Sequence, residues 1–327
     1  MIYVDTKSVD PYFNFGAEYY FAAEKDAGDA VLLLWSTSPT LMLGKYQNAW
    51  EEIDLAYAEE KGINLVRRLS GGGTIYTDGG GLQYSFIRRD GSREISFDEY
   101  MEPVVSALNS LGIPAERGGR NDILLGGRKI SGNAQFKLRG STVHHGSLLF
   151  DTDIGEMVRS TSPPDYKITS KSIKSVRDRV TNVREYIPAA GTTEVFREML
   201  IRALSDILGE RFAPYSLTEE DVRRIEELAE LRFRGRENVF TPSPSFEAEY
   251  LCRFPAGNVK ASFSVKGGVI TAAALSGDYF AAEGTSLDCL VGAPFDKNEI
   301  ASRLSGTETG IYGVTGNDLA RALAKQM

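Results

Sequence analysis

Short apolar runs separated by glycine-rich turns fill most of the first 150 residues, and this texture constrains the fold more than any other feature. Each run is short and ends at residues that favour turns, which is typical of strands. The runs lie at 30–35, 40–43, 64–69, 74–77, 82–87 and 142–150. They do not alternate with helices as regular βαβ units. The pattern therefore predicts an α+β domain with a mixed, mainly antiparallel sheet.

One hairpin and several helices complete this prediction. Residues 122–131 are typical of a β-hairpin that turns at Gly126-Gly127. Asp10 and Pro11 predict the start of a helix that reaches about residue 27. Further helices are expected at 50–61, from a capping box of Ser96 and Glu99 to about residue 111, and within a helix-rich stretch at 154–233 that includes Glu219–Leu231.

A change of texture near residue 244 predicts a domain boundary. Residues 238–245 are rich in proline, serine and other breakers, which is typical of a linker. Strands are expected after it, near 246–254, 259–265 and 269–275, followed by short helices. We therefore expect a large domain at 1–244 and a small α+β accessory domain at 245–327.

The composition excludes several classes of protein. Two cysteines cannot form a disulfide framework. Two cysteines and two adjacent histidines also argue against a structural zinc site. A formal charge of −8 argues against a nucleic-acid-binding protein. No run approaches about 20 apolar residues, and the N-terminus does not resemble a signal peptide. We therefore expect a cytoplasmic protein that does not insert into a membrane.

Three constellations carry candidate chemistry. The first is a triple-glycine segment, in which Arg67 and Arg68 precede Ser70 and the glycines 71–73. Consecutive glycines allow a ligand to approach the backbone and turn N–H groups toward an anion, and an arginine beside them suits a phosphate or carboxylate. A plain glycine turn is the alternative; the arginines favour a ligand. No phosphate loop of the Gly-x4-Gly-Lys-Ser/Thr type occurs.

The other two constellations are weaker alone. Lys129 follows the predicted hairpin and Asp122 begins it, so a lysine for phosphate oxygens and a carboxylate for magnesium lie near each other in sequence. An exposed hairpin with ordinary charges is the alternative. His144 and His145 are the only histidines. Neighbouring residues of a strand face opposite sides, so one should face a pocket and the other should face away.

The order of these motifs resembles the lipoate–protein ligase A family. The motifs are Arg-Arg-x-Ser-Gly-Gly-Gly, Asn121-Asp122, Lys-x-Ser-Gly-x-Ala from Lys129, and His-His-Gly-x-Leu-Leu from His144. Residues 13–18, 44–50 and 173–182 also resemble the family. The resemblance is strong over about 10–185 and weaker in the C-terminal part. It implies a fold shared with biotin protein ligases and class II aminoacyl-tRNA synthetases.

The resemblance also implies the reaction and its site. Lipoate and ATP would give lipoyl-AMP and pyrophosphate, and a lysine of an acceptor protein would then take the lipoyl group. Lys129 would be the catalytic residue. Contacts to ATP or the adenylate are expected from Arg68, Gly73, Thr74, Ile75, Tyr76, Asn121, Asp122 and Lys129. Contacts to lipoate are expected from Phe15, Trp35, Arg68, Ser70, Gly72, Lys129, His145 and Ser147. Asp122 is the candidate ligand of Mg²⁺.

By the same resemblance, the acceptors would be lipoyl domains of 2-oxoacid dehydrogenase E2 subunits or the glycine-cleavage H protein. A basic run at 167–179 is a candidate docking patch, and a solvated charged face is an equal alternative. Competing functions are an ATP-independent octanoyl- or lipoyltransferase, which needs a cysteine nucleophile, and a non-catalytic adenylate-binding protein. The first 251 residues hold no cysteine, which favours the ligase.

The chain departs from the family beside the nucleotide loop. Family members often carry histidine where Thr77 stands and asparagine where Gly81 stands, and the glycines 79–81 make this turn richer in glycine. We expect a looser loop here, one that would tolerate a different acyl chain.

Overall fold

The structure is a computed structural model that describes residues 1–47, 49–161, 179–239, 248–266 and 269–327. The chain forms two compact units. The first comprises residues 1–43, 49–68 and 74–239, and the second comprises 44–48, 69–73 and 240–327. The predicted boundary at residue 244 lies outside the described residues.

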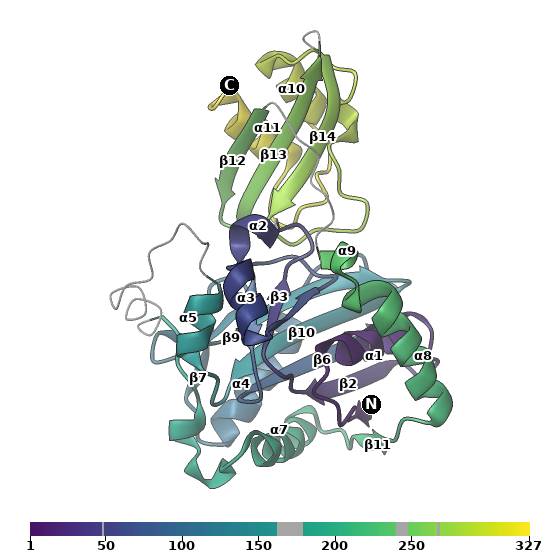
Figure 1. The fold of residues 1–327 in the computed structure, drawn as a ribbon, viewed down its shortest axis with the longest axis vertical. Coiled ribbons are helices and arrows are strands. Elements are labelled where there is room, and N and C mark those ends of the chain that lie inside the picture. Colours follow the sequence, from purple (N-terminus) through teal and green to yellow (C-terminus); the bar gives the residue numbers. More distant parts are fainter. Residues whose placement is uncertain (48, 162–178, 240–247, 267–268) are drawn as a thin grey trace. The chain divides into compact units, whose positions relative to one another are not determined.

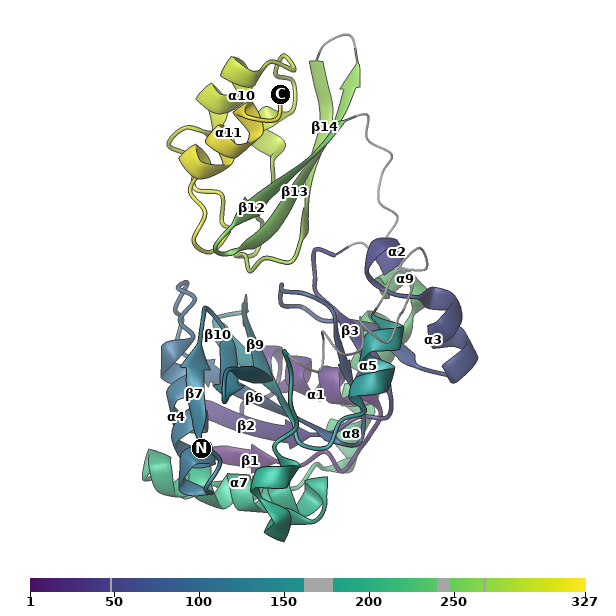
Figure 2. The same cartoon turned by 90° about the vertical axis from the view of Figure 1, so that its left-hand side faces the viewer.

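An eight-stranded sheet forms the centre of the first unit, with the strand order β11-β1-β2-β6-β10-β9-β8-β7 (Figures 1 and 2). Its strands are β1 (Ile2–Val4), β2 (Ala30–Trp35), β6 (Gly81–Arg89), β7 (Ala115–Gly118), β8 (Asp122–Leu125), β9 (Arg128–Leu138), β10 (Ser141–Leu149) and β11 (Ala213–Tyr215). β1 pairs in parallel with both neighbours, and every other pair is antiparallel. The predicted α+β fold with a mixed, mainly antiparallel sheet is confirmed.

A second, three-stranded sheet of the first unit has the order β4-β3-β5. It consists of β3 (Thr40–Leu43), β4 (Asn64–Arg67) and β5 (Ile75–Thr77). β3 and β4 are parallel, and β3 and β5 are antiparallel. The short helices α2 (Ala49–Glu52), α3 (Leu55–Lys61), α5 (Ile154–Ser160) and α9 (Arg236–Val239), with the 3₁₀ turns η1 (Arg184–Tyr186) and η2 (Pro188–Ala190), complete the loops of this unit.

Two pairs of long helices cover the two faces of the large sheet. α1 (Pro11–Ala23) packs beside α8 (Glu219–Ala229) and its π-helical continuation η3 (Glu230–Arg234), whereas α4 (Asp98–Ser110) packs beside α7 (Thr193–Leu208). The alternation of β6 shows the two faces, because Ser85 contacts Glu18 of α1 while Phe86 packs against Tyr100 of α4.

The first helix begins where the sequence predicts and packs unusually closely. The Asp10 carboxylate accepts a hydrogen bond from the backbone N–H of Tyr12 at 2.8 Å, and Pro11 takes the first helical position. At Gly16 an added Cβ would lie 2.7 Å from the carbonyl oxygen of Ile225 on α8. Gly16 therefore allows the two helix backbones to approach each other.

Two predicted helices differ from the structure. The helix expected at 50–61 is divided into α2 and α3, because Asp54 leaves the helical conformation and caps α3 through the N–H of Tyr57 at 3.0 Å. The predicted capping box of Ser96 and Glu99 is wrong. The residue before α4 is Phe97, without a side-chain cap, while the Ser96 N–H donates to the side chain of Gln135 at 3.0 Å. A partner on the sheet replaces the local cap.

The second unit is a small α+β structure. Its sheet has the order β12-β13-β14, with β12 (Ala248–Phe254), β13 (Gly257–Lys266) and β14 (Val269–Gly277), all antiparallel. The 3₁₀ turn η4 (Asp288–Leu290) and the helices α10 (Lys297–Leu304) and α11 (Gly316–Ala324) pack with it around a core that includes Phe263 and Leu319. The three strands lie near the predicted ranges, and short helices follow them as expected. None of the helices described in the two units is both long enough and apolar enough to cross a membrane.

Candidate active site

A buried carboxylate links α1 to the central strands. Glu18 is 2% exposed and accepts a hydrogen bond from the Ser85 hydroxyl on β6 at 2.7 Å. The same carboxylate oxygen lies 2.9 Å from Nδ1 of His145 on β10. Because a carboxylate only accepts, Nδ1 of His145 is the donor. The predicted lipoate-binding residue His145 is thus oriented by a buried acid.

Aromatic rings gather beside this carboxylate. Phe15, three residues before Glu18 and therefore on the same face of α1, meets Trp35 edge-on with ring centres 5.2 Å apart. The ring of His145 lies 6.4 Å from that of Phe15, and Phe233 of η3 stacks on Phe15 at 5.6 Å. The structure brings together the three residues predicted to border the lipoyl tail and adds Phe233.

The arginine pair at the end of β4 is largely desolvated. Arg68 is 6% exposed and donates from Nη1 to the carbonyl oxygen of Met42 at 2.6 Å. Burial, aided by repulsion from Arg67 and opposed by the charge of Glu18, lowers the pKa of Arg68 to about 10. The side chain remains a cation at neutral pH, and in low dielectric its field on a nearby anion is strong.

The hairpin of β8 and β9 carries the second cation of the site, Lys129. Its turn is Gly126-Gly127, with φ of 55° and 74°, as a two-residue type I′ turn requires. The Lys129 ammonium lies 2.7 Å from the Asp122 carboxylate, and both side chains are about one third exposed. The backbone of Lys129 also pairs with Val180. The predicted neighbours Asp122 and Lys129 therefore form an ion pair at the surface.

Lys129 and His145 lie on the same face of the large sheet. His145 is paired with Ala134, and Ser147 with Gly132, so these four residues share one face. A Cβ built on Gly132 would lie 3.0 Å from Nζ of Lys129, which places the ammonium over that glycine. Two residues along a strand span about 7 Å. The lysine and the aromatic cluster are therefore separated by a distance that a short acyl chain can bridge.

Polar side chains on the opposite face support the hairpin. His144 is fully buried, and its Nε2 lies 3.1 Å from Oδ1 of Asn133, which also accepts from the Tyr84 hydroxyl. Asn133 donates to the carbonyl oxygen of Asn121 at 3.2 Å, and Asn121 donates back to the carbonyl oxygen of Asn133 at 2.6 Å. Asn121 therefore holds the turn that precedes Asp122. The two histidines face opposite sides of the sheet, as predicted for neighbours on a strand, and a ligand pocket at His145 stays a prediction.

The triple-glycine segment belongs to the second unit, so Ser70, Gly72 and Gly73 lie there while Arg68 and Thr74 lie in the first. The Gly72 N–H donates to the carbonyl oxygen of Tyr279 at 3.1 Å. A Cβ on Gly71 would lie 1.6 Å from that same oxygen. The expectation of a free N–H group is therefore wrong for Gly72, and the absence of a side chain at Gly71 is explained by the close approach of the Tyr279 backbone. Gly73 is exposed, and a Cβ there would meet no atom within 4 Å.

The loop that begins the next strand is tied down. Thr74 precedes β5, in which Ile75 pairs with Met42 and Tyr76 with Leu41. Beyond it, the carbonyl oxygens of the glycines 79–81 accept hydrogen bonds from Thr193 Oγ1, the Asp151 N–H and Ser36 Oγ at 2.8 Å each. The expected looser loop is therefore wrong.

The two departures from the family explain each other. A Cβ on Gly81 would lie 2.5 Å from Oγ1 of Thr77, which accepts from the Gln83 side chain at 2.6 Å. The Thr77–Gln83 contact thus occupies the space of a side chain at position 81.

Three residues of the site were not predicted from the sequence. Glu18 is an isolated acid among aromatic residues of one helix, and this pattern was the signal for it. Phe233 carries no local signal, because it reaches Phe15 only through the packing of α8 and η3 on α1. Asn133 lies within the Lys-x-Ser-Gly-x-Ala motif, but its role depends on a partner across the hairpin. Of the predicted basic patch, residues 167–177 lie outside the described residues.

The side chains near Asp122 could hold a metal ion only together with oxygen atoms of the substrate. Among the residues that the structure describes, no group of three or more His, Cys, Asp or Glu side chains could hold a metal ion. Asp122 is a single carboxylate at the surface. Mg²⁺ is commonly held by one or two carboxylates together with phosphate oxygens and water, and Asp122 fits that arrangement.

Comparison with known proteins shows the family of this chain. Residues 10–205 match the lipoyl protein ligase A/B catalytic domain, and residues 243–323 match the bacterial lipoate protein ligase C-terminus. The chain is 38% identical over 317 residues to lipoate-protein ligase LplJ of Bacillus subtilis, covering 95% of this chain and 96% of that protein.

Two solved structures extend the comparison. A bipartite lipoate protein ligase from Thermoplasma acidophilum, studied with its E2 lipoyl domain, is 27% identical with a TM-score of 0.65, covering 76% of this chain and 98% of that one. A lipoate-protein ligase A bound with ATP is 26% identical with a TM-score of 0.62, covering 74% and 98%. This chain therefore belongs to the lipoate–protein ligase family and is an ATP-dependent enzyme that joins lipoate to protein.

Proposed function

We propose that lipoate is activated on the α1 face of the large sheet, with its tail at the aromatic cluster of Phe15, Trp35 and His145 and its carboxylate near Lys129. The observation that carries this proposal is the shared face, on which the Lys129 ammonium lies over Gly132, one cross-strand row from the pair of His145 and Ala134. An apolar tail and an anionic head then meet the matching chemistry at the two ends of a path of about 7 Å.

The first step brings two anions together. A carboxylate oxygen of lipoate bonds to the α-phosphorus of ATP, the bond between the α-phosphorus and the bridging oxygen breaks, and pyrophosphate leaves. Two unit charges 4 Å apart interact by about 4 kcal/mol at an effective dielectric of 20. Arg68 and Lys129 can supply this attraction where negative charge accumulates. Thr74 to Tyr76 and Asn121 would border the nucleotide.

The second step requires positioning more than acid–base chemistry. The acceptor lysine attacks the acyl carbon, AMP leaves with the phosphate oxygen, and the new amide nitrogen loses its proton. Lys129 would hold the carbonyl oxygen while this occurs, and Arg68 and Ser147 would orient the lipoyl group. No residue of this chain needs to become acylated.

A divalent cation fits at Asp122. When bound, Mg²⁺ would neutralise the phosphate oxygens. The Asp122 carboxylate would then exchange its present partner, Lys129, for the metal, and the freed ammonium would turn to the substrate. We expect Asp122→Asn to weaken the Mg²⁺-dependent part of ATP binding in calorimetry while leaving lipoate binding unchanged; equal metal dependence in both proteins would remove this assignment.

The acceptor is proposed to be a lipoyl domain of a 2-oxoacid dehydrogenase E2 subunit or the glycine-cleavage H protein. An E2 lipoyl domain accompanies the Thermoplasma acidophilum relative, which supports the first of these. The consumption of ATP accords with the expected cytoplasmic location.

A thioester mechanism has little support. Cys252 is buried, and Cys289 is exposed but has a pKa that burial raises, so neither thiol is activated. Both lie in the second unit. An ATP-independent acyltransferase therefore has no evident nucleophile.

The Lys129→Ala variant tests the proposed function. Loss of one well-placed cation should lower lipoate-dependent exchange of pyrophosphate into ATP by about 100-fold or more. Lys137→Ala is the matched control, because Lys137 lies on the same strand but contacts Thr142 instead. Full exchange by Lys129→Ala would refute the role of the lysine. No exchange by the wild type would favour the non-catalytic adenylate-binding alternative.

A further inference from the structure

A single π-helical turn ends the α8 helix and places the buried ring of Phe233 against the aromatic cluster of Phe15, Trp35 and His145. This turn, η3, spans Glu230–Arg234, and its Phe233 is 1% exposed. Phe233 stacks on Phe15 with ring centres 5.6 Å apart and planes inclined by 28°. Isolated π-turns are rare and are frequent at functional sites. The π-turn changes the direction of the side chains that follow α8, so it determines where Phe233 points.

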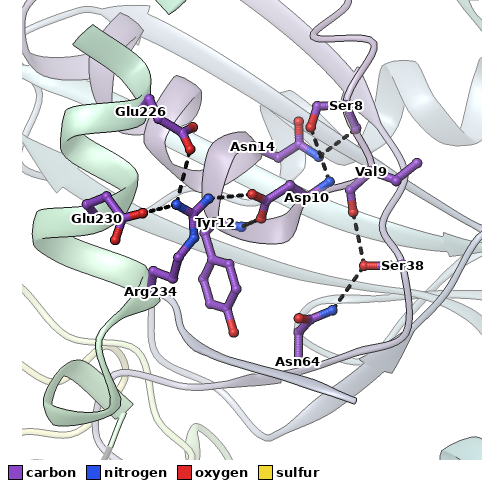
Figure 3. A network of polar contacts seen from close by, with 10 residues as sticks. All are labelled: Ser8, Val9, Asp10, Tyr12, Asn14, Ser38, Asn64, Glu226, Glu230 and Arg234. Atoms are coloured by element: carbon purple, nitrogen blue, oxygen red, sulfur yellow. Dashed lines mark hydrogen bonds and ion pairs between the residues drawn. The ribbon is translucent and has the colours of Figure 1, made fainter. Parts of the chain in front are cut away.

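The next residue fixes this turn to the helix that carries Phe15. Figure 3 shows the Arg234 guanidinium between Asp10, Glu226 and Glu230, which come from α1 and α8–η3. Asp10 is also the N-cap of α1. The guanidinium carbon lies 5.4 Å from the centre of the Tyr12 ring. We call this set the Arg234 clamp: Asp10, Tyr12, Glu226, Glu230 and Arg234.

The clamp is continuous with the loops that lead into the small sheet. Ser8 accepts a hydrogen bond from the side chain of Asn14 at 2.9 Å through its carbonyl oxygen. Ser38 Oγ donates to the carbonyl oxygen of Val9 and accepts from the side chain of Asn64 (Figure 3). The start of α1 is therefore held from two sides. Phe233 therefore packs against a helix whose N-terminus is held in place by these contacts.

We infer that Phe233 determines which acyl chains the enzyme accepts, by closing the end of the acyl site that lies away from Lys129. This inference rests on the proposed placement of the lipoyl tail. Phe15 meets Trp35, His145 and Phe233, and only the last of these comes from outside the sheet. A chain that runs from Lys129 past His145 ends against Phe15 and the ring behind it.

The selectivity for chain length follows from the rigid packing of Phe15 and Phe233 at the end of the acyl site. Each methylene group that is buried strengthens binding by about fourfold. An acid that is too long must either leave methylenes in water or displace a buried ring. Arg234 and Phe233 are adjacent, so displacement of the ring also strains the ion pairs of the clamp. Leucine is smaller than phenylalanine by roughly one methylene group, so Phe233→Leu should give room for about one more methylene.

The test compares saturated acids of eight, ten and twelve carbons as substrates for adenylate formation by the full-length enzyme. We expect Phe233→Leu to raise kcat/KM for the ten- and twelve-carbon acids, relative to the eight-carbon acid, by about fourfold, the gain from one more buried methylene. Phe196→Leu is the matched control. Phe196 is equally buried and stacks on Phe150 at 4.8 Å, but it lies on α7, across the sheet. Its chain-length profile should equal that of the wild type.

A second pair of variants tests the clamp without altering the ring. Arg234→Met should broaden the profile in the same direction as Phe233→Leu. Arg224→Met is its control, because Arg224 also joins two glutamates between α1 and α8 but holds the opposite end of α1. An unchanged ratio in both Phe233→Leu and Arg234→Met, in proteins that adenylate the eight-carbon acid, overturns the inference. A wild type that adenylates none of the acids overturns the proposed function itself.

Discussion

Replacement of His144 by phenylalanine should reverse the order of stability between variant and wild type as the pH falls. His144 is completely buried, stacks on Tyr100 at 4.8 Å and donates to Asn133. Burial, helped by repulsion from His145 and Arg117, holds the pKa of His144 well below its usual range. The folded protein therefore keeps this ring neutral, whereas the unfolded chain takes up a proton near pH 6.5.

The magnitude follows from that difference. Below pH 6.5 the unfolded state binds one more proton, so the free energy of unfolding falls by up to about 1.4 kcal/mol per pH unit. The loss from His144 is negligible at pH 7.5, about 1 kcal/mol near pH 6 and about 2 kcal/mol at pH 5.0. Phenylalanine loses one buried hydrogen bond, worth about 1 kcal/mol, because Asn133 still accepts from Tyr84. The two stability curves should therefore cross near pH 6.

Urea denaturation between pH 7.5 and 5.0 provides the assay, since the two proteins differ in this one titratable side chain. Tyr100→Phe is the control: it changes the same cluster but keeps His144, so its curve should run parallel to that of the wild type. Parallel curves for His144→Phe and the wild type would refute the reasoning, because His144 would then titrate alike in the folded and unfolded states.

Three further predictions concern packing and a buried acid. Gly16→Ala should destabilise the first unit by about 1–3 kcal/mol in urea denaturation, because its Cβ would lie 2.7 Å from a carbonyl oxygen of α8; an equally stable variant would contradict this close contact. Gly81→Asn should cost a similar amount, part of which Thr77→Ala restores in a double-mutant cycle, and additive effects would show that the two sites are independent. Burial tends to raise the pKa of Asp221, but hydrogen bonds, first from Lys25, outweigh it and lower that pKa. Stability from Asp221 is therefore present above about pH 4 and lost below it, so Asp221→Asn should show a weaker acid dependence than the wild type.

The elements that the sequence predicted well are those whose signals are local. Asp10 and Pro11 begin α1, Gly62 ends α3 with φ of 63°, and Gly126-Gly127 turns the hairpin, because each depends only on near neighbours. The capping box at Ser96 failed because Gln135, on a strand far along the chain, offered a better partner. Short strands such as β1 and β11 have too few residues to show a period.

The candidate site shows the same division. Lys129 and Asp122 were predicted as neighbours because one hairpin holds both. The motif predicted that a ligand would approach the backbone of Gly71 and Gly72, and it could not show that the backbone of Tyr279 lies there instead. The role of Phe233 could not be predicted from the sequence, since its position depends on a π-turn and on ion pairs with other segments of the chain.

The membership of residues 44–48 and 69–73 in the second unit has a practical meaning for anyone dividing this protein at its linker. Ser70 accepts from the Lys45 N–H, the Tyr46 carbonyl accepts from the Gly277 N–H, and the rings of Tyr46 and Tyr279 stack at 4.6 Å. A fragment that stops at residue 239 would keep both early segments but remove Gly277 and Tyr279. The backbone groups of the two early segments and the ring of Tyr46 would then face solvent, so such a fragment should aggregate more readily than the intact chain. Two loops that lie much earlier in the sequence thus need the C-terminal residues in order to keep their structure.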